Sequence, residues 1–240
     1  MQQNKFLKVF IEDCKYYDLE NKELKAILRY VKAKNKTILD VGAGIGRLSF
    51  PLTKYAKEVV ALEKDKRLAS YFEKYKNKKV KFVNQSLESY TKKSKRRKFD
   101  IILLAWPTIN FKFINLVKRL MYKNSKFILI TCDNNSDFET IIDKLDAGKG
   151  FEKYIKNKQK FLKNLPKRFK LLFKKKIKTY YSFPNKKIAF RIIKNSMELW
   201  FRKRFNKKTN KKLGGIIKKH KKGEKVIFEE EIWFYLMGEE

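Results

Sequence analysis

Short apolar runs alternate with amphipathic stretches from residue 36 to about residue 145. Apolar runs of this length are typical of strands, and several are apolar almost throughout, as strands covered on both faces of a sheet are. The intervening stretches repeat their apolar positions with helical spacing. The pattern predicts strands at 37–41, 58–62, 80–83, 99–104 and 126–131, and helical segments at 47–55, 66–75, 87–90 and 110–121.

The two ends of the chain carry further elements. Strands separated by helices of this length form βαβ units, which build a parallel sheet with right-handed crossovers. The flanking regions are less regular and, toward the C-terminus, much more basic. We predict helices at 6–17, 19–32 and 137–167, a strand at 169–182, a helix at 185–205, a basic loop around Gly214 and Gly215, and a last strand at 225–237.

A glycine-rich turn follows the first predicted strand. Residues 40–47 read Asp-Val-Gly-Ala-Gly-Ile-Gly-Arg. Glycines permit a tight turn and let a ligand touch the backbone where a Cβ would block it. The helix start after Gly46 offers unpaired N–H groups and a positive dipole end. A dinucleotide-binding turn needs Gly-x-Gly-x-x-Gly, and Arg47 stands where its third glycine would be, so a nicotinamide-linked oxidoreductase is a distant alternative.

The pattern Asp-x-Gly-x-Gly-x-Gly resembles motif I of the class I S-adenosylmethionine-dependent methyltransferases. The resemblance covers residues 37–132 well and extends more loosely to the last strand. It implies an α/β fold: a Rossmann-like three-layer αβα sandwich with a mostly parallel seven-stranded sheet and an antiparallel last strand. It implies S-adenosylmethionine as cofactor and S-adenosylhomocysteine as product. The residues expected to shape the methionine end of the pocket are Asp40, Gly42, Ala43, Gly44 and Gly46.

No internal repeat and no Pro- or Ser-rich linker interrupts the chain, so one domain over 1–240 is the simplest organisation. At 240 residues and 43% hydrophobic content, the chain can bury a full core. We expect a helical cap at 1–35, an S-adenosylmethionine-binding core at 36–145, and a basic strand–helix–strand region at 146–240 that completes the sheet.

Two further positions bear on the cofactor. Glu63 ends the second predicted strand, and a carboxylate can accept from two hydroxyl groups at once. The resemblance implies that Glu63 binds the ribose with Lys64 beside it; the alternative is an exposed glutamate paired with a neighbouring lysine. After the third strand, Ser86 stands where the family usually has an Asp that meets the adenine amino group. We expect Ser86 and Leu87 to border the adenine, and an ordinary turn explains them equally well.

The loop over 105–110 reads Ala-Trp-Pro-Thr-Ile-Asn and follows the fourth strand, where the family usually places substrate-facing residues. Methyltransferases acting on an exocyclic base nitrogen commonly have Asp, Asn or Ser, then Pro-Pro, then an aromatic. Trp106 replaces that acceptor and threonine replaces the second proline, which disfavours base N-methylation by that pattern. We expect Ala105 to border the cofactor and Trp106, Pro107 and Asn110 to face the acceptor. Trp106 would stack on the substrate or, alternatively, seal the cofactor pocket.

The cysteines and the histidine suggest no other chemistry. Cys132, after the fifth strand, superficially resembles the nucleophile of RNA cytosine-5 methyltransferases, but the companion Pro-Cys is missing. A small buried residue at a strand end is the better interpretation. Cys14, Cys132 and His220 form no metal-ligand or disulfide pattern, so we expect no metal, and no catalytic base can be named.

The charge of the chain points to polyanions. Sixty-one Lys and Arg against 25 Asp and Glu give a formal net charge of +36, which attracts RNA, DNA or an anionic membrane surface. Basic clusters interleaved with aromatics, an arrangement that binds single-stranded RNA, occur at 92–98, 153–163, 167–178 and 202–222. Alternatively, the lysines reflect the codon bias of an AT-rich genome, and the aromatics face the core.

The sequence therefore predicts a class I S-adenosylmethionine-dependent methyltransferase that acts on RNA or on a small molecule. We expect it in the cytoplasm, because the chain has no signal-peptide core and its apolar runs are too short to cross a bilayer. The alternative is a catalytically inactive methyltransferase fold that serves as an RNA-binding or scaffold protein. The oligomeric state and the methylated atom are not predicted.

Overall fold

The apolar runs of the first half form parallel strands, as predicted. The computed structural model describes residues 2–74, 79–94, 97–107, 112–132, 136–145 and 149–239. Pairing in register joins β1 to β2 and β4, β2 to β3, and β4 to β5, all parallel. The strands are β1 (Thr37–Val41), β2 (Glu58–Leu62), β3 (Val80–Val83), β4 (Phe99–Ala105) and β5 (Met121–Cys132).

The sheet continues beyond β5 with the late strands β6 (Lys170–Phe183) and β8 (Lys225–Gly238), and its order is β3-β2-β1-β4-β5-β8-β6. The two-residue strand β7 (Lys221–Lys222) pairs antiparallel with β8, so the sheet has eight strands where seven were predicted. The mostly parallel α/β sheet with antiparallel last strands is confirmed. Because β1 has β2 on one side and β4 on the other, the strand order reverses at β1, where open α/β sheets bind ligands.

By its internal contacts the chain separates into two compact units. Unit 1 consists of residues 1–22, 132–153 and 177–232, and unit 2 of residues 23–131, 154–176 and 233–240. Strands β6 and β8 run through both units. The glycine-rich turn, Glu63 and Trp106 all belong to unit 2, so the candidate site can be described within that unit alone.

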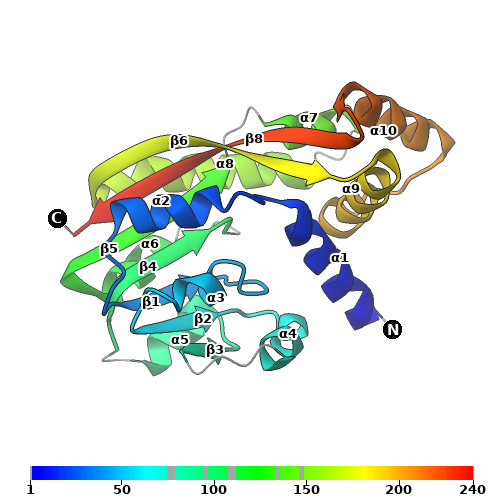
Figure 1. The fold of residues 1–240 in the computed structure, drawn as a ribbon. Coiled ribbons are helices and arrows are strands. Elements are labelled where there is room, and N and C mark those ends of the chain that lie inside the picture. The colour runs from blue at the N-terminus through cyan, green and yellow to red at the C-terminus, as the bar shows by residue number, and fades with distance from the viewer. Residues whose placement is uncertain are drawn as a thin grey trace. The chain divides into compact units, whose positions relative to one another are not determined.

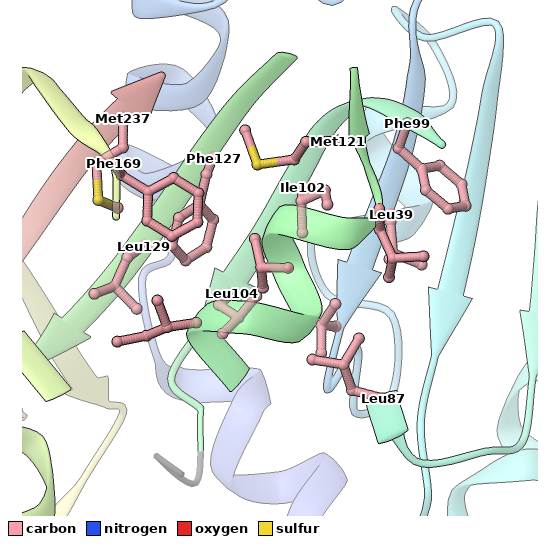
Figure 2. Packing of buried hydrophobic residues seen from close by; sticks show 14 of the residues in the cluster. Leu39, Leu87, Phe99, Ile102, Leu104, Met121, Phe127, Leu129, Phe169 and Met237 are labelled. Atoms are coloured by element: carbon pink, nitrogen blue, oxygen red, sulfur yellow. The ribbon is translucent and has the colours of Figure 1, made fainter. Parts of the chain in front are cut away.

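Unit 2 surrounds the parallel strands with helices (Figure 1). Its core joins side chains of β1, β4 and β5 to Phe169 and Met237 (Figure 2). Phe127 and Phe169 have ring centroids 5.1 Å apart, and both are fully buried. The helices with all or most of their residues in this unit are α2 (Lys22–Tyr30), α3 (Ser49–Leu52), η1 (Lys66–Leu68), α4 (Ala69–Lys74), α5 (Leu87–Lys93), α6 (Phe113–Arg119), α8 (Lys149–Asn164) and η2 (Leu165–Lys167).

Unit 1 has its own core, built mainly by helices. Helix α1 lies against α9, where Arg191 contacts Glu12 at 2.7 Å and Phe6 meets Trp200 edge-on at 5.7 Å. The carboxyl of Glu230 accepts the Phe138 N–H at 3.0 Å, and burial raises its pKa to about 8. The helices of this unit are α1 (Gln2–Tyr16), α7 (Asp137–Lys144), α9 (Lys186–Phe201) and α10 (Lys207–Lys219).

Helix α10 corrects a prediction, because a basic loop was expected there. Asn206 and Thr209 form a capping box at its start, which satisfies N–H groups that would otherwise be unpaired. Leu213, Ile216 and Ile217 are spaced for one helical face and are buried. The two glycines of this segment do not break the helix. None of the helices described is both long enough and apolar enough to cross a membrane.

Candidate cofactor and acceptor site

The glycine-rich turn closes over the carboxyl end of β2. Gly42, Gly44 and Gly46 have φ of 76°, 60° and 80°, the left-handed region that favours glycine. The N–H groups of Gly42 and Ala43 both donate to the carbonyl of Leu62, at 2.8 and 3.1 Å. The turn predicted from sequence is therefore formed and anchored by backbone bonds.

Glycine is favoured at positions 42 and 46 for different reasons. A Cβ at Gly42 would meet no atom within 4 Å, so the space above this exposed position is open. A Cβ at Gly46 would lie 2.6 Å from the Phe50 ring and 2.9 Å from the Phe72 ring. Gly46 is thus required by packing, whereas Gly42 borders a space that a ligand can fill.

Glu63 is held beside this turn by backbone donors. Its Oε2 accepts the Gly44 N–H at 3.1 Å and its Oε1 accepts the Asp65 N–H at 2.8 Å. Asn84, in the turn after β3, donates to the Glu63 carbonyl at 2.8 Å. A carboxylate offers about four lone-pair positions, so the fixed carboxylate of Glu63 keeps capacity to accept from ribose hydroxyls. Lys64, the next residue, is exposed.

Asp40 acts inside the protein rather than at its surface. It is 3% exposed, and its Oδ2 accepts the Ser49 hydroxyl at 2.6 Å. Burial is the largest cause that raises the pKa of Asp40 to about 6, while the Ser49 bond and the positive charge of Arg47 oppose that rise. Asp40 therefore ties the end of β1 to the start of α3.

Ser86 and Leu87 have structural roles that account for their presence. Ser86 is the N-cap of α5, and its hydroxyl oxygen accepts the Ser89 N–H at 3.2 Å. Leu87 is 3% exposed and belongs to the core of unit 2. Their predicted contact with adenine stays a prediction.

We call residues 105–110, which begin at the end of β4 and include the residues expected to face the acceptor, the acceptor loop. Its second residue has an unusual backbone conformation. Trp106 has a φ of 53°, and its backbone N–H donates to the Ile130 carbonyl at 2.9 Å. Ala105 and Trp106 are half-buried, and Pro107 is buried. Asn110, the third predicted acceptor-facing residue, lies outside the described residues. Cys132 is buried at the end of β5, as expected for a small residue at a strand end.

Sequence reasoning missed the residue that joins these loops. Glu23, in the first turn of α2, is completely buried and accepts the Trp106 indole N–H at 2.7 Å. Its other carboxylate oxygen is paired with Arg47, directly after the glycine-rich turn. A charged residue within an otherwise apolar helical face was the available signal.

Two of the aromatics that interleave the basic clusters lie in the core, and a lysine of one cluster lies over an aromatic ring of β8 outside the clusters. Phe161 and Phe169 are fully buried in the core of unit 2, so for these two the core interpretation holds. On β8, the ring of Trp233 has the Lys174 ammonium 4.0 Å from its centroid. Lys174 itself is exposed. This cation–π pair places a positive charge and an aromatic ring side by side near the surface.

One comparison decides the family. The model of the family described as "Ribosomal RNA adenine dimethylase" matches residues 4–218, which include the glycine-rich turn, Glu63 and the acceptor loop. The chain belongs to this family. The resemblance to the class I S-adenosylmethionine-dependent methyltransferases is thereby confirmed.

Curated relatives match over short segments. The chain is 46% identical over 50 residues to "Probable ribosomal RNA small subunit methyltransferase A" of Methanosphaera stadtmanae, covering 20% of this chain and 18% of that protein. It is 36% identical over 59 residues to "Ribosomal RNA small subunit methyltransferase A" of Wigglesworthia glossinidia brevipalpis, covering 24% and 23%. The matches thus span about a fifth of the length of these relatives.

Solved structures share the fold at low sequence identity. A candidate type II methyltransferase from Anaeromyxobacter dehalogenans superposes with a TM-score of 0.61 at 13% identity, covering 90% of this chain and 94% of that one. A candidate methyltransferase from Bacillus halodurans superposes with a TM-score of 0.55 at 15% identity, covering 91% and 99%. These likenesses establish the methyltransferase fold.

Proposed function

We propose that this protein transfers methyl groups from S-adenosylmethionine to adenine in ribosomal RNA of the small subunit. The observation that carries the proposal is the family match, because it extends over nearly the whole chain and names both the base and the kind of RNA. The two relatives that match over short segments are named for small-subunit ribosomal RNA and agree with it.

The described residues fit the cofactor. The open space beside Gly42 admits a ligand close to the backbone, and the Glu63 carboxylate, fixed by Gly44 and Asp65, retains acceptor capacity for ribose hydroxyls. When bound, S-adenosylmethionine supplies a methyl group on a sulfonium sulfur. The task of the protein is then to hold donor and acceptor in line and to exclude water.

The electrostatics favour RNA over a small molecule. A net charge of +36 supplies a strong, sequence-independent attraction for phosphates. Helix α8 adds exposed lysines at 156 and 160 to those of β6. A small acceptor would gain little from a field of this extent.

A non-catalytic RNA-binding role is the second candidate, and the acceptor loop supports it. In its described part, Ala105-Trp106-Pro107, no side chain offers the carboxylate or amide oxygen that methyltransferases of exocyclic base nitrogens commonly place there. The Trp106 indole N–H is engaged by Glu23. This loop therefore favours the non-catalytic role, whereas the family match favours methyl transfer.

Methyl transfer to small ribosomal subunits tests the proposal. Purified protein is incubated with methyl-labelled S-adenosylmethionine and with subunits assembled from unmodified transcribed RNA. We expect RNase-sensitive label, recovered as N-methylated adenosine by nucleoside mass spectrometry. Binding of S-adenosylhomocysteine is measured in parallel by calorimetry.

Two glutamate variants complete the experiment. Glu63→Ala is expected to lose S-adenosylhomocysteine binding and transfer together, whereas Glu224→Ala, at an exposed turn, keeps both. RNA binding by the wild type without affinity for S-adenosylhomocysteine would establish the non-catalytic role. Binding of S-adenosylhomocysteine by the wild type with no transfer of label to the RNA would contradict methylation of ribosomal RNA.

A further inference from the structure

Glu23 is a buried carboxylate that connects two loops of the site. It lies in the first turn of α2 and has no exposed surface. Its Oε1 accepts the Trp106 indole N–H at 2.7 Å, and its Oε2 is paired with the Arg47 guanidinium. A buried carboxylate is tolerated only when it is paired and hydrogen-bonded, and these two contacts offset part of the cost of burying Glu23.

Trp106 is held in a backbone conformation that a bulky residue avoids. Its φ of 53° lies in the left-handed region, where glycine is usual. Such conformations persist only where the surroundings impose them, and they gather at functional sites. The backbone N–H of Trp106 donates to the Ile130 carbonyl on β5, and its indole N–H donates to Glu23, so both the backbone and the side chain are held.

The loops that Glu23 connects meet at one edge of the sheet. Arg47 follows the glycine-rich turn at the end of β1, and Trp106 follows the end of β4. The two strands are adjacent and parallel, with Asp40 in register with Leu103. Cofactor and acceptor would therefore meet at this edge, and Glu23 joins its two sides through side-chain contacts.

We propose that Glu23 is a positioning residue for methyl transfer, which sets the orientation of Trp106 in the loop that follows β4. This inference rests on the proposed function. With Glu23 present, Trp106 holds one orientation before the acceptor arrives, so no reorganisation is needed when the reaction occurs. The Glu23 carboxylate acts through Trp106 and is not assigned a contact with the reacting atoms.

Tryptophan fluorescence measures the interaction without reference to activity. The chain has three tryptophans, and replacing Trp200 and Trp233 by phenylalanine leaves Trp106 as the single reporter. In this background we expect Glu23→Ala to raise acrylamide quenching of Trp106 at least twofold. Glu23→Gln retains an oxygen that can accept the indole N–H, so its quenching should stay close to that of the parent.

Kinetics with all three tryptophans present measures the consequence. Glu23→Ala and Trp106→Phe should each lower kcat for RNA methylation at least tenfold, with KM for S-adenosylmethionine within twofold of wild type. Glu23→Gln should stay within threefold of the wild-type kcat. Trp106→Phe leaves the Glu23–Arg47 pair in place, so it tests the proposal even if Glu23→Ala does not fold. Glu20→Ala, an exposed glutamate before the same helix, is the matched control.

The outcomes separate this inference from the proposed function. Unchanged quenching in Glu23→Ala, or a wild-type kcat in Trp106→Phe, would overturn the positioning role. Equal losses of kcat in Glu23→Gln and Glu23→Ala would also overturn it, because they would assign the effect to the ion pair with Arg47. A wild type that transfers no methyl group overturns the proposed function instead, and the quenching comparison still decides whether Glu23 holds Trp106.

Discussion

The Ser49 hydroxyl donates a 2.6 Å hydrogen bond to Oδ2 of Asp40, and both side chains are buried. Burial, as the largest cause, raises the pKa of Asp40 to about 6. A carboxyl whose pKa is higher in the folded than in the unfolded protein favours folding at low pH and loses that contribution as the pH rises through the folded pKa. The bond from Ser49 therefore matters most above about pH 6, where Asp40 is ionised.

Ser49→Ala should destabilise the protein in a pH-dependent manner. A hydrogen bond to a charged group contributes about 1.5–3 kcal/mol, and one between neutral groups about 0.5–1.5 kcal/mol. We expect the larger loss of unfolding free energy at pH 8 and the smaller loss at pH 5, measured by urea titration. Ser70→Ala, at an exposed position of α4, should change neither value. Equal losses at both pH values would contradict the raised pKa of Asp40.

Gly42→Ala should mainly weaken cofactor binding, whereas Gly46→Ala should mainly lower the free energy of unfolding. Alanine at Gly42 costs about 1 kcal/mol of backbone strain but clashes with nothing, so cofactor affinity should fall more than stability. Alanine at Gly46 meets the Phe50 and Phe72 rings and should cost about 1–3 kcal/mol by overpacking. Calorimetry with S-adenosylhomocysteine and urea unfolding measure the two effects. If the two variants lost the same affinity for S-adenosylhomocysteine and had the same free energy of unfolding, the different roles of Gly42 and Gly46 would be refuted.

Glu230→Gln should remove a pH dependence of stability. Burial raises the pKa of Glu230 from 4.5 to about 8, so its contribution to folding is complete below about pH 4.5 and is lost as the pH rises through 8. From pH 6 to pH 9, the free energy of unfolding of Glu230→Gln should rise relative to that of the wild type by an amount on the order of 2 kcal/mol. Thermal unfolding at both pH values checks this, with the exposed Glu224→Gln as control. A constant difference between variant and wild type would contradict it.

RNA affinity should depend steeply on salt. A protein that neutralises six to ten phosphates loses about 10³–10⁵ in affinity between 50 and 200 mM salt, and a net charge of +36 makes contacts of that number available. Fluorescence anisotropy with labelled ribosomal RNA measures the slope, and S-adenosylhomocysteine binding at the same salts serves as the reference. A change of less than tenfold would identify the lysines as compositional bias.

Strand positions were predictable where a short, mostly apolar run ends at a polar residue or a turn. The bounds of β1, β2 and β3 agree with the predicted ones for this reason, although β3 contains the exposed Lys81. Strand β5 begins at Met121, earlier than predicted, because its first part contains the exposed polar residues 122–124. Helix α10 was missed because Gly214 and Gly215 suggested a loop.

The glycine-rich turn and Glu63 could be found from sequence because their signals are local: glycines at fixed offsets and an acid at a strand end. Glu23 could not, because Arg47 and Trp106 lie 24 and 83 residues away along the chain. Helical periodicity records that a position faces inward and does not record which distant polar group meets it there. The contact between a helix and two loops appears only once the sheet has brought those loops together.

The division of the chain into two units has a consequence for genetics. Each unit is assembled from three separate stretches of sequence, so no single continuous fragment contains one unit whole without residues of the other. A truncation within the chain therefore cannot retain the whole unit that carries the candidate cofactor site without also retaining residues of the other unit. A recombination break between residues 23 and 232 therefore separates parts of at least one unit, and we expect such hybrids to fold only when both parents supply compatible partners across the break.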